Sequence, residues 1–148
     1  MPAVAELLDL PARRAAARQN LPRTALAVFA TEGARAFACD VLRAAGVTDV
    51  TPACGPACER AADTGVDVIV TDWPARGDIG DHIDALRRDT NGARRDTPVV
   101  LLTSRDGRAD IVAARAAGVN AYVVKPVSPA MLKHRLAKIA TNAPGRLA

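Results

Sequence analysis

Apolar and polar positions follow one another along this chain in a pattern that predicts strands alternating with helices. Several strands are continuous apolar runs, which are typical of strands covered on both faces of a sheet. The predicted strands are residues 24–30, 47–53, 66–71, 97–103 and 119–124. The segments between and after them carry apolar residues at helical spacing, and the predicted helices are 31–46, 56–65, 80–90, 107–118 and 128–140.

End signals support these helices. The first ends at Gly46, and the last begins with Ser128 as N-cap and Pro129 in the first helical position. Strands that alternate with helices favour right-handed βαβ units, so we predict the α/β class, with a doubly wound parallel sheet of five strands.

The domain is predicted to cover residues 24–140. Residues 1–23 combine an amphipathic start with a basic, helix-prone stretch, and are expected to form an N-terminal helical extension. This extension packs on the domain, forms a homodimer or is a partly disordered tail, and the sequence does not separate these alternatives. Residues 141–148 are expected to form a C-terminal tail.

Composition and charge exclude several classes of protein. The longest apolar run is too short to cross a bilayer and no export signal is visible, so we expect a cytoplasmic protein without membrane contact. The net charge is only +4 and aromatic residues make up 3% of the chain, so DNA binding is not expected. The three cysteines do not have the spacing of a zinc or redox site and are predicted to be reduced thiols.

Three polar residues follow the apolar strands at their ends. Asp72 comes directly after strand 66–71, Thr103 ends strand 97–103, and Lys125 follows strand 119–124. In a parallel sheet the carboxyl ends of the strands share one edge, where ligands usually bind. A carboxylate at the end of a buried strand needs a partner, and Lys125 is the predicted partner of Asp72.

Four sequence segments carry a resemblance to a known family. They are VIVTDW at 68–73 with Gly80 eight residues after Asp72, PVVLLTS at 98–104, ARAAGVNAYVVKP at 114–126, and the Ser-Pro start of the last helix. In order and spacing they resemble response regulator receiver domains of the single-domain chemotaxis type. The resemblance covers residues 24–140 and implies a flavodoxin-like sheet with strand order 2-1-3-4-5.

The resemblance also implies roles for individual residues. Asp72 would accept a phosphoryl group from the phosphohistidine of a histidine kinase. Lys125 would bind a phosphoryl oxygen, Thr103 would donate its hydroxyl to the phosphoryl group, and Tyr122 would be the aromatic switch residue that follows Thr103. Pro126 would shape the turn after the lysine through a cis peptide bond. No enzymatic activity is expected.

The chain departs from the family pattern where Mg²⁺ is normally held. A gapless match puts Phe29 and Ala30 in the positions of two adjacent acids. The remaining candidate ligands are Asp72, Glu32 and the backbone carbonyl of Pro74, so Mg²⁺ is a doubtful cofactor.

Two functions therefore stay open. One is an atypical receiver that acts through protein–protein contacts with a histidine kinase or other signalling protein, with impaired or absent Mg²⁺-dependent phosphorylation. The other is a working receiver switched by phosphorylation of Asp72. The atypical receiver is the one we favour from the sequence. Both place the output on the face formed by the helix 107–118, the strand 119–124 and the helix 128–140, including Arg105, Arg108, Ala121, Tyr122 and Lys125.

The arginines of a near-repeat offer a further hypothesis. The sequence RRDT occurs at 87–90 and at 94–97, which places Arg87, Arg88, Arg94 and Arg95 close together. Such a segment is either a solvated loop or an anion site, and some receiver-like proteins bind cyclic di-GMP through arginines.

Overall fold

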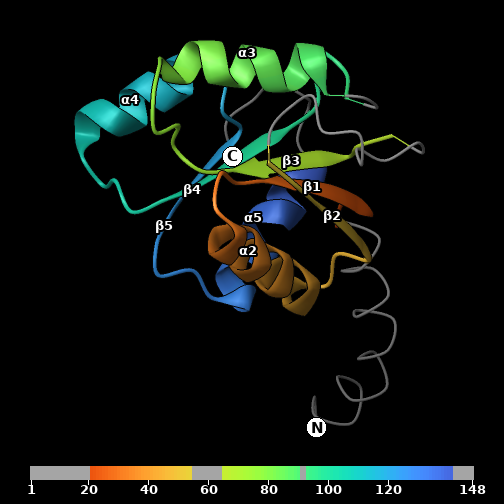
Figure 1. Cartoon of the computed structure of the whole chain (residues 1–148). Helices are drawn as coiled ribbons and strands as arrows, with labels where there is room; N and C mark the ends of the chain where they lie inside the picture. The colour runs from red at the N-terminus through yellow and green to blue at the C-terminus, as the bar shows by residue number, and fades with distance from the viewer. Residues whose placement is uncertain (1–20, 55–64, 91–92, 142–148) are drawn as a thin grey trace, which may run out of the picture.

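A parallel sheet of five strands forms the centre of the structure, a computed structural model that describes residues 21–54, 65–90 and 93–141 (Figure 1). The strand order is β2-β1-β3-β4-β5, as the resemblance implied. The strands are β1 (Thr24–Val28), β2 (Asp49–Ala53), β3 (Val68–Thr71), β4 (Val99–Thr103) and β5 (Ala121–Val124). The helices in the described ranges are α2 (Glu32–Ala45), α3 (Ile79–Asp89), α4 (Arg108–Ala116) and α5 (Pro129–Thr141).

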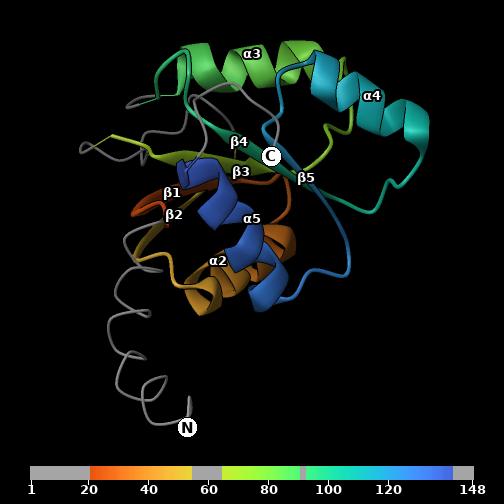
Figure 2. The same cartoon turned by 180° about the vertical axis from the view of Figure 1, so that it is seen from behind.

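The helices form two layers. α3 and α4 cover one face of the sheet, and α2 and α5 cover the other, as both views show (Figures 1 and 2). Alternate strand residues point to opposite layers. Ala25 and Ala27 pack toward α2 and α5, whereas Leu26 and Val28 pack toward α3 and α4. The doubly wound α/β fold is thus confirmed.

Most element boundaries follow the predicted signals. Gly46 ends α2 with a positive φ of 110°, a conformation that favours glycine. The hydroxyl of Ser128 accepts a hydrogen bond from the backbone N–H of Met131, and α5 begins at Pro129, as predicted. α3 begins at Ile79, one residue earlier than predicted, because the Asp78 side chain caps it by accepting from the N–H of Gly80.

Several predictions fall outside the described residues. These are the helix at 56–65, most of the N-terminal extension, the turn at 91–92, the tail from 142 and Cys58. The other two cysteines are free thiols, as expected. Among the described helices, none has the length and apolar character that crossing a membrane requires.

Candidate functional site

The carboxyl edge of the sheet brings together the three polar residues that the sequence placed there. β3 ends at Thr71 and leads into Asp72, and β4 ends at Thr103. The register pairs Thr103 with Val124, so that Lys125 follows beside it, and the Lys125 N–H donates to Thr103 O over 2.8 Å. The predicted convergence of an acid, a hydroxyl and an amine on one edge is therefore present in the fold.

Asp72 is a half-buried carboxylate. Burial raises its pKa above the ordinary value, while a hydrogen bond from its own backbone N–H and the charge of Lys125 lower it, with burial dominating. The predicted partner Lys125 therefore acts on the carboxylate, although the described residues contain no Asp72–Lys125 ion pair within 4.0 Å. Lys125 is exposed and acts on Asp72 from a longer distance.

Phe29 and Ala30, the residues aligned with the two adjacent acids of the family pattern, differ in their surroundings. The register pairs Val28 with Thr71, which puts Phe29 level with Asp72. Phe29 is only 2% exposed and belongs to the apolar cluster under α2 and α5, and Ala30 is exposed. The alternation of β1 therefore continues into Phe29, which fills the core at a position where a carboxylate would otherwise serve a metal.

An arginine holds the backbone of this turn. Arg35 of α2 donates from Nη1 to the carbonyl oxygens of Phe29 and Ala30, over 2.8 Å and 3.1 Å. Glu32 is the first residue of α2. It is exposed and, with Arg35, lines a cavity of about 390 Å³ between α2 and Pro52 of the edge strand β2, whereas Asp72 follows β3 on the other side of β1.

The donor set at this edge does not fit Mg²⁺. The ion prefers octahedral oxygen coordination with one or two carboxylates from the protein. Here Phe29 lies level with the half-buried Asp72, and the half-buried Pro74 contributes at most a carbonyl oxygen. Across the described ranges, no three acidic, histidine or cysteine side chains form a group that could hold a metal ion.

The two predicted switch residues share a hydrogen-bond partner. Thr103 Oγ1 accepts from the backbone N–H of Arg105 over 3.1 Å, and the Tyr122 hydroxyl donates to the carbonyl of Arg105 over 2.7 Å. Pro126 follows Lys125 through a cis peptide bond, as predicted. The place of Arg105 between these two residues could not be predicted from the sequence, because its backbone makes both contacts.

A second polar contact lies beneath Asp72. The Thr71 hydroxyl donates to Val28 O over 2.9 Å and lies 3.0 Å from Nε2 of His82 on α3. With the hydroxyl proton given to Val28, His82 Nε2 must be the donor in that contact. Burial lowers the pKa of His82, so this imidazole is neutral at physiological pH.

The arginines of the near-repeat do not act as one cluster. Arg87 donates to three neutral acceptors, which are Thr97 O at 3.0 Å, Gly118 O at 2.8 Å and Asn120 Oδ1 at 2.7 Å. It is therefore a structural residue that joins α3 to the segments before β4 and β5.

The other three arginines are exposed. Arg88 pairs with Asp89 at 3.0 Å, and Arg94 lies 3.7 Å from Asp96. Arg87, Arg88, Arg95 and Asp84 line a cavity of about 490 Å³, and Arg94 is not among its lining residues.

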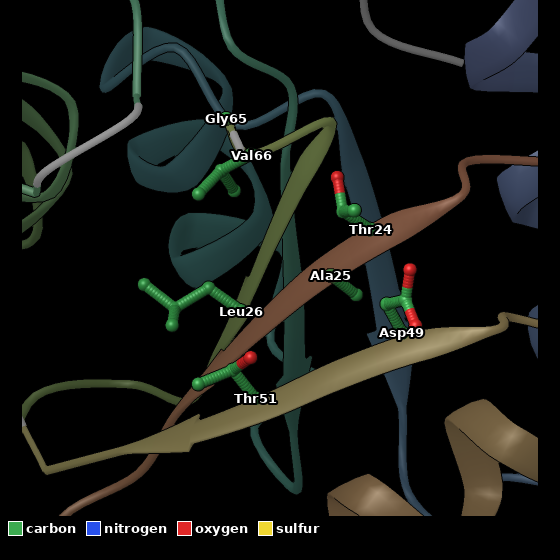
Figure 3. Close-up of a pocket in the computed structure, with 7 residues that line it drawn as sticks. All are labelled: Thr24, Ala25, Leu26, Asp49, Thr51, Gly65 and Val66. Carbon is green, nitrogen blue, oxygen red and sulfur yellow. The ribbon is translucent and has the colours of Figure 1, made fainter. Parts of the chain in front are cut away.

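A smaller hollow of about 240 Å³ lies at the opposite end of the sheet (Figure 3). Thr24 and Asp49, the first residues of β1 and β2, contribute to its wall, together with Leu26, Thr51 and Val66. Because these strands start here, the hollow is remote from the carboxyl edge that carries Asp72.

Comparison with known proteins relates this chain to receiver domains. No family model matches the sequence. The chemotaxis protein CheY of Pseudomonas aeruginosa is 40% identical over 74 residues, which is 49% of this chain and 58% of that protein. The chain spans 58–60% of the length of such curated relatives.

Two solved structures extend the likeness over most of the fold. A response regulator protein from Burkholderia multivorans is 32% identical, with a TM-score of 0.56, over 83% of this chain and 98% of that chain. The receiver domain of a sensor histidine kinase from P. aeruginosa, which holds a magnesium ion in its active-site cleft, is 25% identical, with a TM-score of 0.62, over 81% and 98%. Because strand order, sequence identity and near-complete coverage of a solved relative agree, this chain belongs to the response regulator receiver domains.

Proposed function

We propose that this receiver domain serves two-component signalling as a protein-docking module in the cytoplasm, with impaired or absent Mg²⁺-dependent phosphorylation of Asp72. It is not an enzyme in this proposal. Its partner is a histidine kinase or another signalling protein. The observation that carries the proposal is the burial of Phe29 in the core, level with Asp72, while the exposed Glu32 lines a cavity beside the edge strand β2.

The competing function is a working receiver that is switched by phosphorylation of Asp72. Its support is the retained set of Thr103, Tyr122 and Lys125 around the carboxyl edge. Phosphoryl transfer depends on positioning and on neutralisation of charge, and Mg²⁺ supplies much of that charge. Lys125, whose charge lowers the pKa of Asp72, provides less positive charge than a Mg²⁺ ion would.

Trp73 allows a direct test, because it is the only tryptophan and immediately follows Asp72. Its fluorescence is recorded while Mg²⁺ is added up to ~10 mM, well above what a magnesium carboxylate site requires, followed by beryllofluoride. The proteins are the wild type, Asp72→Asn, Ala30→Asp and Ala36→Asp. Ala30→Asp adds a carboxylate beside Asp72, whereas Ala36→Asp adds the same charge on an exposed position of α2.

We expect no saturable Mg²⁺ response in the wild type or in Ala36→Asp, and a saturable response in Ala30→Asp. A wild-type response that Asp72→Asn abolishes, followed by a beryllofluoride-dependent change, would overturn the proposal in favour of the working receiver.

The cavity beside α3 supports a second candidate function, the binding of a cyclic dinucleotide. Arg95 favours it, because the described residues provide no ion-pair partner for this side chain. Arg87 is committed to neutral acceptors, and Asp84 places a negative charge in the same wall. Titration with cyclic di-GMP, with Arg95→Ala as the variant, tests this function. In a calorimetric titration, a heat of binding that saturates for the wild type and is absent for Arg95→Ala would support cyclic dinucleotide binding.

A further inference from the structure

Arg105 connects the segment after Asp72 with the segment that carries Tyr122. It lies between β4 and α4, and the carbon at the centre of its guanidinium is 4.6 Å from the centroid of the Trp73 ring. A guanidinium over an indole face is the most favourable of the cation–π pairs between side chains. Because Trp73 is bonded directly to Asp72, a movement of that segment displaces the ring on which Arg105 rests.

The backbone of the same residue continues the connection. Its N–H donates to Thr103 Oγ1 and its carbonyl accepts the hydroxyl of Tyr122. The side chain and the backbone of Arg105 therefore contact Trp73 after β3, Thr103 at the end of β4 and Tyr122 within β5. The rings of Trp73 and Tyr122 also pack against the same apolar cluster beneath α3 and α4.

The ion pair that holds the Arg105 side chain is weak and exposed to water. Its side chain is 51% exposed, and its Nη1 lies 3.4 Å from Oδ1 of Asp110 in the first turn of α4. An exposed ion pair of this length stabilises weakly, so the guanidinium is free to leave Trp73 when the ring moves.

We propose that Arg105 is a positioning residue that couples the conformation of the segment after Asp72 to the position of the Tyr122 ring. Displacement of Trp73 releases the guanidinium, and the Arg105 backbone then shifts its carbonyl relative to the Tyr122 hydroxyl. The inference deepens the proposed function, since it names the route by which an event at the carboxyl edge reaches the face of α4 and β5. The coupling itself requires neither Mg²⁺ nor a phosphoryl group.

The composition of the chain makes this coupling measurable. It contains one tyrosine, so incorporation of 3-fluorotyrosine gives a single ¹⁹F resonance, from Tyr122. The spectra are compared for the wild type, Trp73→Leu, Arg105→Ala and the double variant. Arg108→Ala is the matched control, because it removes an exposed guanidinium from the same region of the chain. Thermal unfolding of each protein verifies that it is folded.

We expect Trp73→Leu and Arg105→Ala to shift the Tyr122 resonance, and Trp73→Leu to add little when Arg105 is already absent. Arg105→Lys, which keeps the charge but loses the planar group, gives an intermediate shift. An unchanged resonance in Trp73→Leu, or fully additive shifts in the double variant, would overturn the coupling. A shift in Arg108→Ala equal to that in Arg105→Ala would overturn it as well.

The two proposals fail separately in these experiments. The ¹⁹F spectra are recorded without Mg²⁺ and without a phosphoryl analogue, so their outcome does not depend on phosphorylation of Asp72. The Mg²⁺ response of Ala30→Asp, in turn, is measured with Arg105 in place.

Discussion

Replacement of Arg87 by alanine tests whether this residue is part of the fold or part of an anion site. The side chain is half-buried and its donors reach three oxygens, one of them on the buried Asn120. Asn120 Oδ1 also accepts from the N–H of Val99, so Arg87 and Asn120 together fix the start of β4 against the start of β5. Removal of the guanidinium leaves two backbone carbonyls and one amide oxygen short of a donor.

The expected loss follows from these hydrogen bonds. Each bond to a charged group contributes about 1.5–3 kcal/mol, but the contributions do not add and water replaces part of them at a half-buried site. We therefore expect Arg87→Ala to lower the free energy of unfolding by about 2–4 kcal/mol. With an m-value of about 1.5 kcal/mol/M, the urea midpoint falls by about 1–3 M.

The neighbouring arginine provides the control for this measurement. Arg88 is exposed and pairs only with Asp89 among the interactions of the described residues, so Arg88→Ala is expected to leave the midpoint unchanged. Because the three acceptors of Arg87 are uncharged, most of the loss in Arg87→Ala is expected to remain at high salt, which screens only the attraction of Asp84 and Asp96. Equal midpoints for the two variants would refute the structural role of Arg87.

Three further predictions concern the carboxyl edge and its surroundings. Burial raises the pKa of Asp72, so the charged carboxylate opposes folding, and Asp72→Asn is expected to raise the urea midpoint at pH 7. This gain in stability should shrink toward about pH 4, where the Asp72 carboxylate is also protonated in the unfolded chain. Burial lowers the pKa of His82, so the unfolded chain binds a proton first as the pH falls. Stability is expected to fall below about pH 6.5, and urea titrations should find this dependence reduced in His82→Gln. Phe29→Ala is expected to cost about 3–5 kcal/mol in the same assay, because it opens a cavity in the core under α2 and α5; a loss below about 1 kcal/mol would contradict the burial of this ring.

Much of the fold was readable from the sequence because its signals are local. Apolar runs marked the strands, and Gly46 and Ser128 marked helix ends at the positions found in the structure. The gathering of Asp72, Thr103 and Lys125 followed from topology alone, since parallel strands end at one edge. The burial of Phe29 was also encoded, because it continues the alternation of Ala25 and Ala27.

The contacts that the sequence did not reveal depend on side-chain geometry across distant segments. Arg87 meets acceptors 10, 31 and 33 residues away, and no spacing rule links them. Lys125 does lower the pKa of Asp72, but the sequence could not predict its distance from the carboxylate, because adjacency at a sheet edge does not fix where a long, solvated lysine side chain lies. Arg105 was overlooked as a connecting residue because two of its contacts use backbone atoms, which carry no sequence signature.

The different surroundings of Phe29 and Ala30 have a consequence for how such a domain can change over generations. A carboxylate at position 30 is tolerated, because this residue faces water. A carboxylate at position 29 would bury a charge and empty the core at the same time. A pair of adjacent acids is therefore much easier to introduce at one position than at the other. Position 30 requires one substitution, whereas position 29 also needs compensating substitutions among the residues that surround the Phe29 ring.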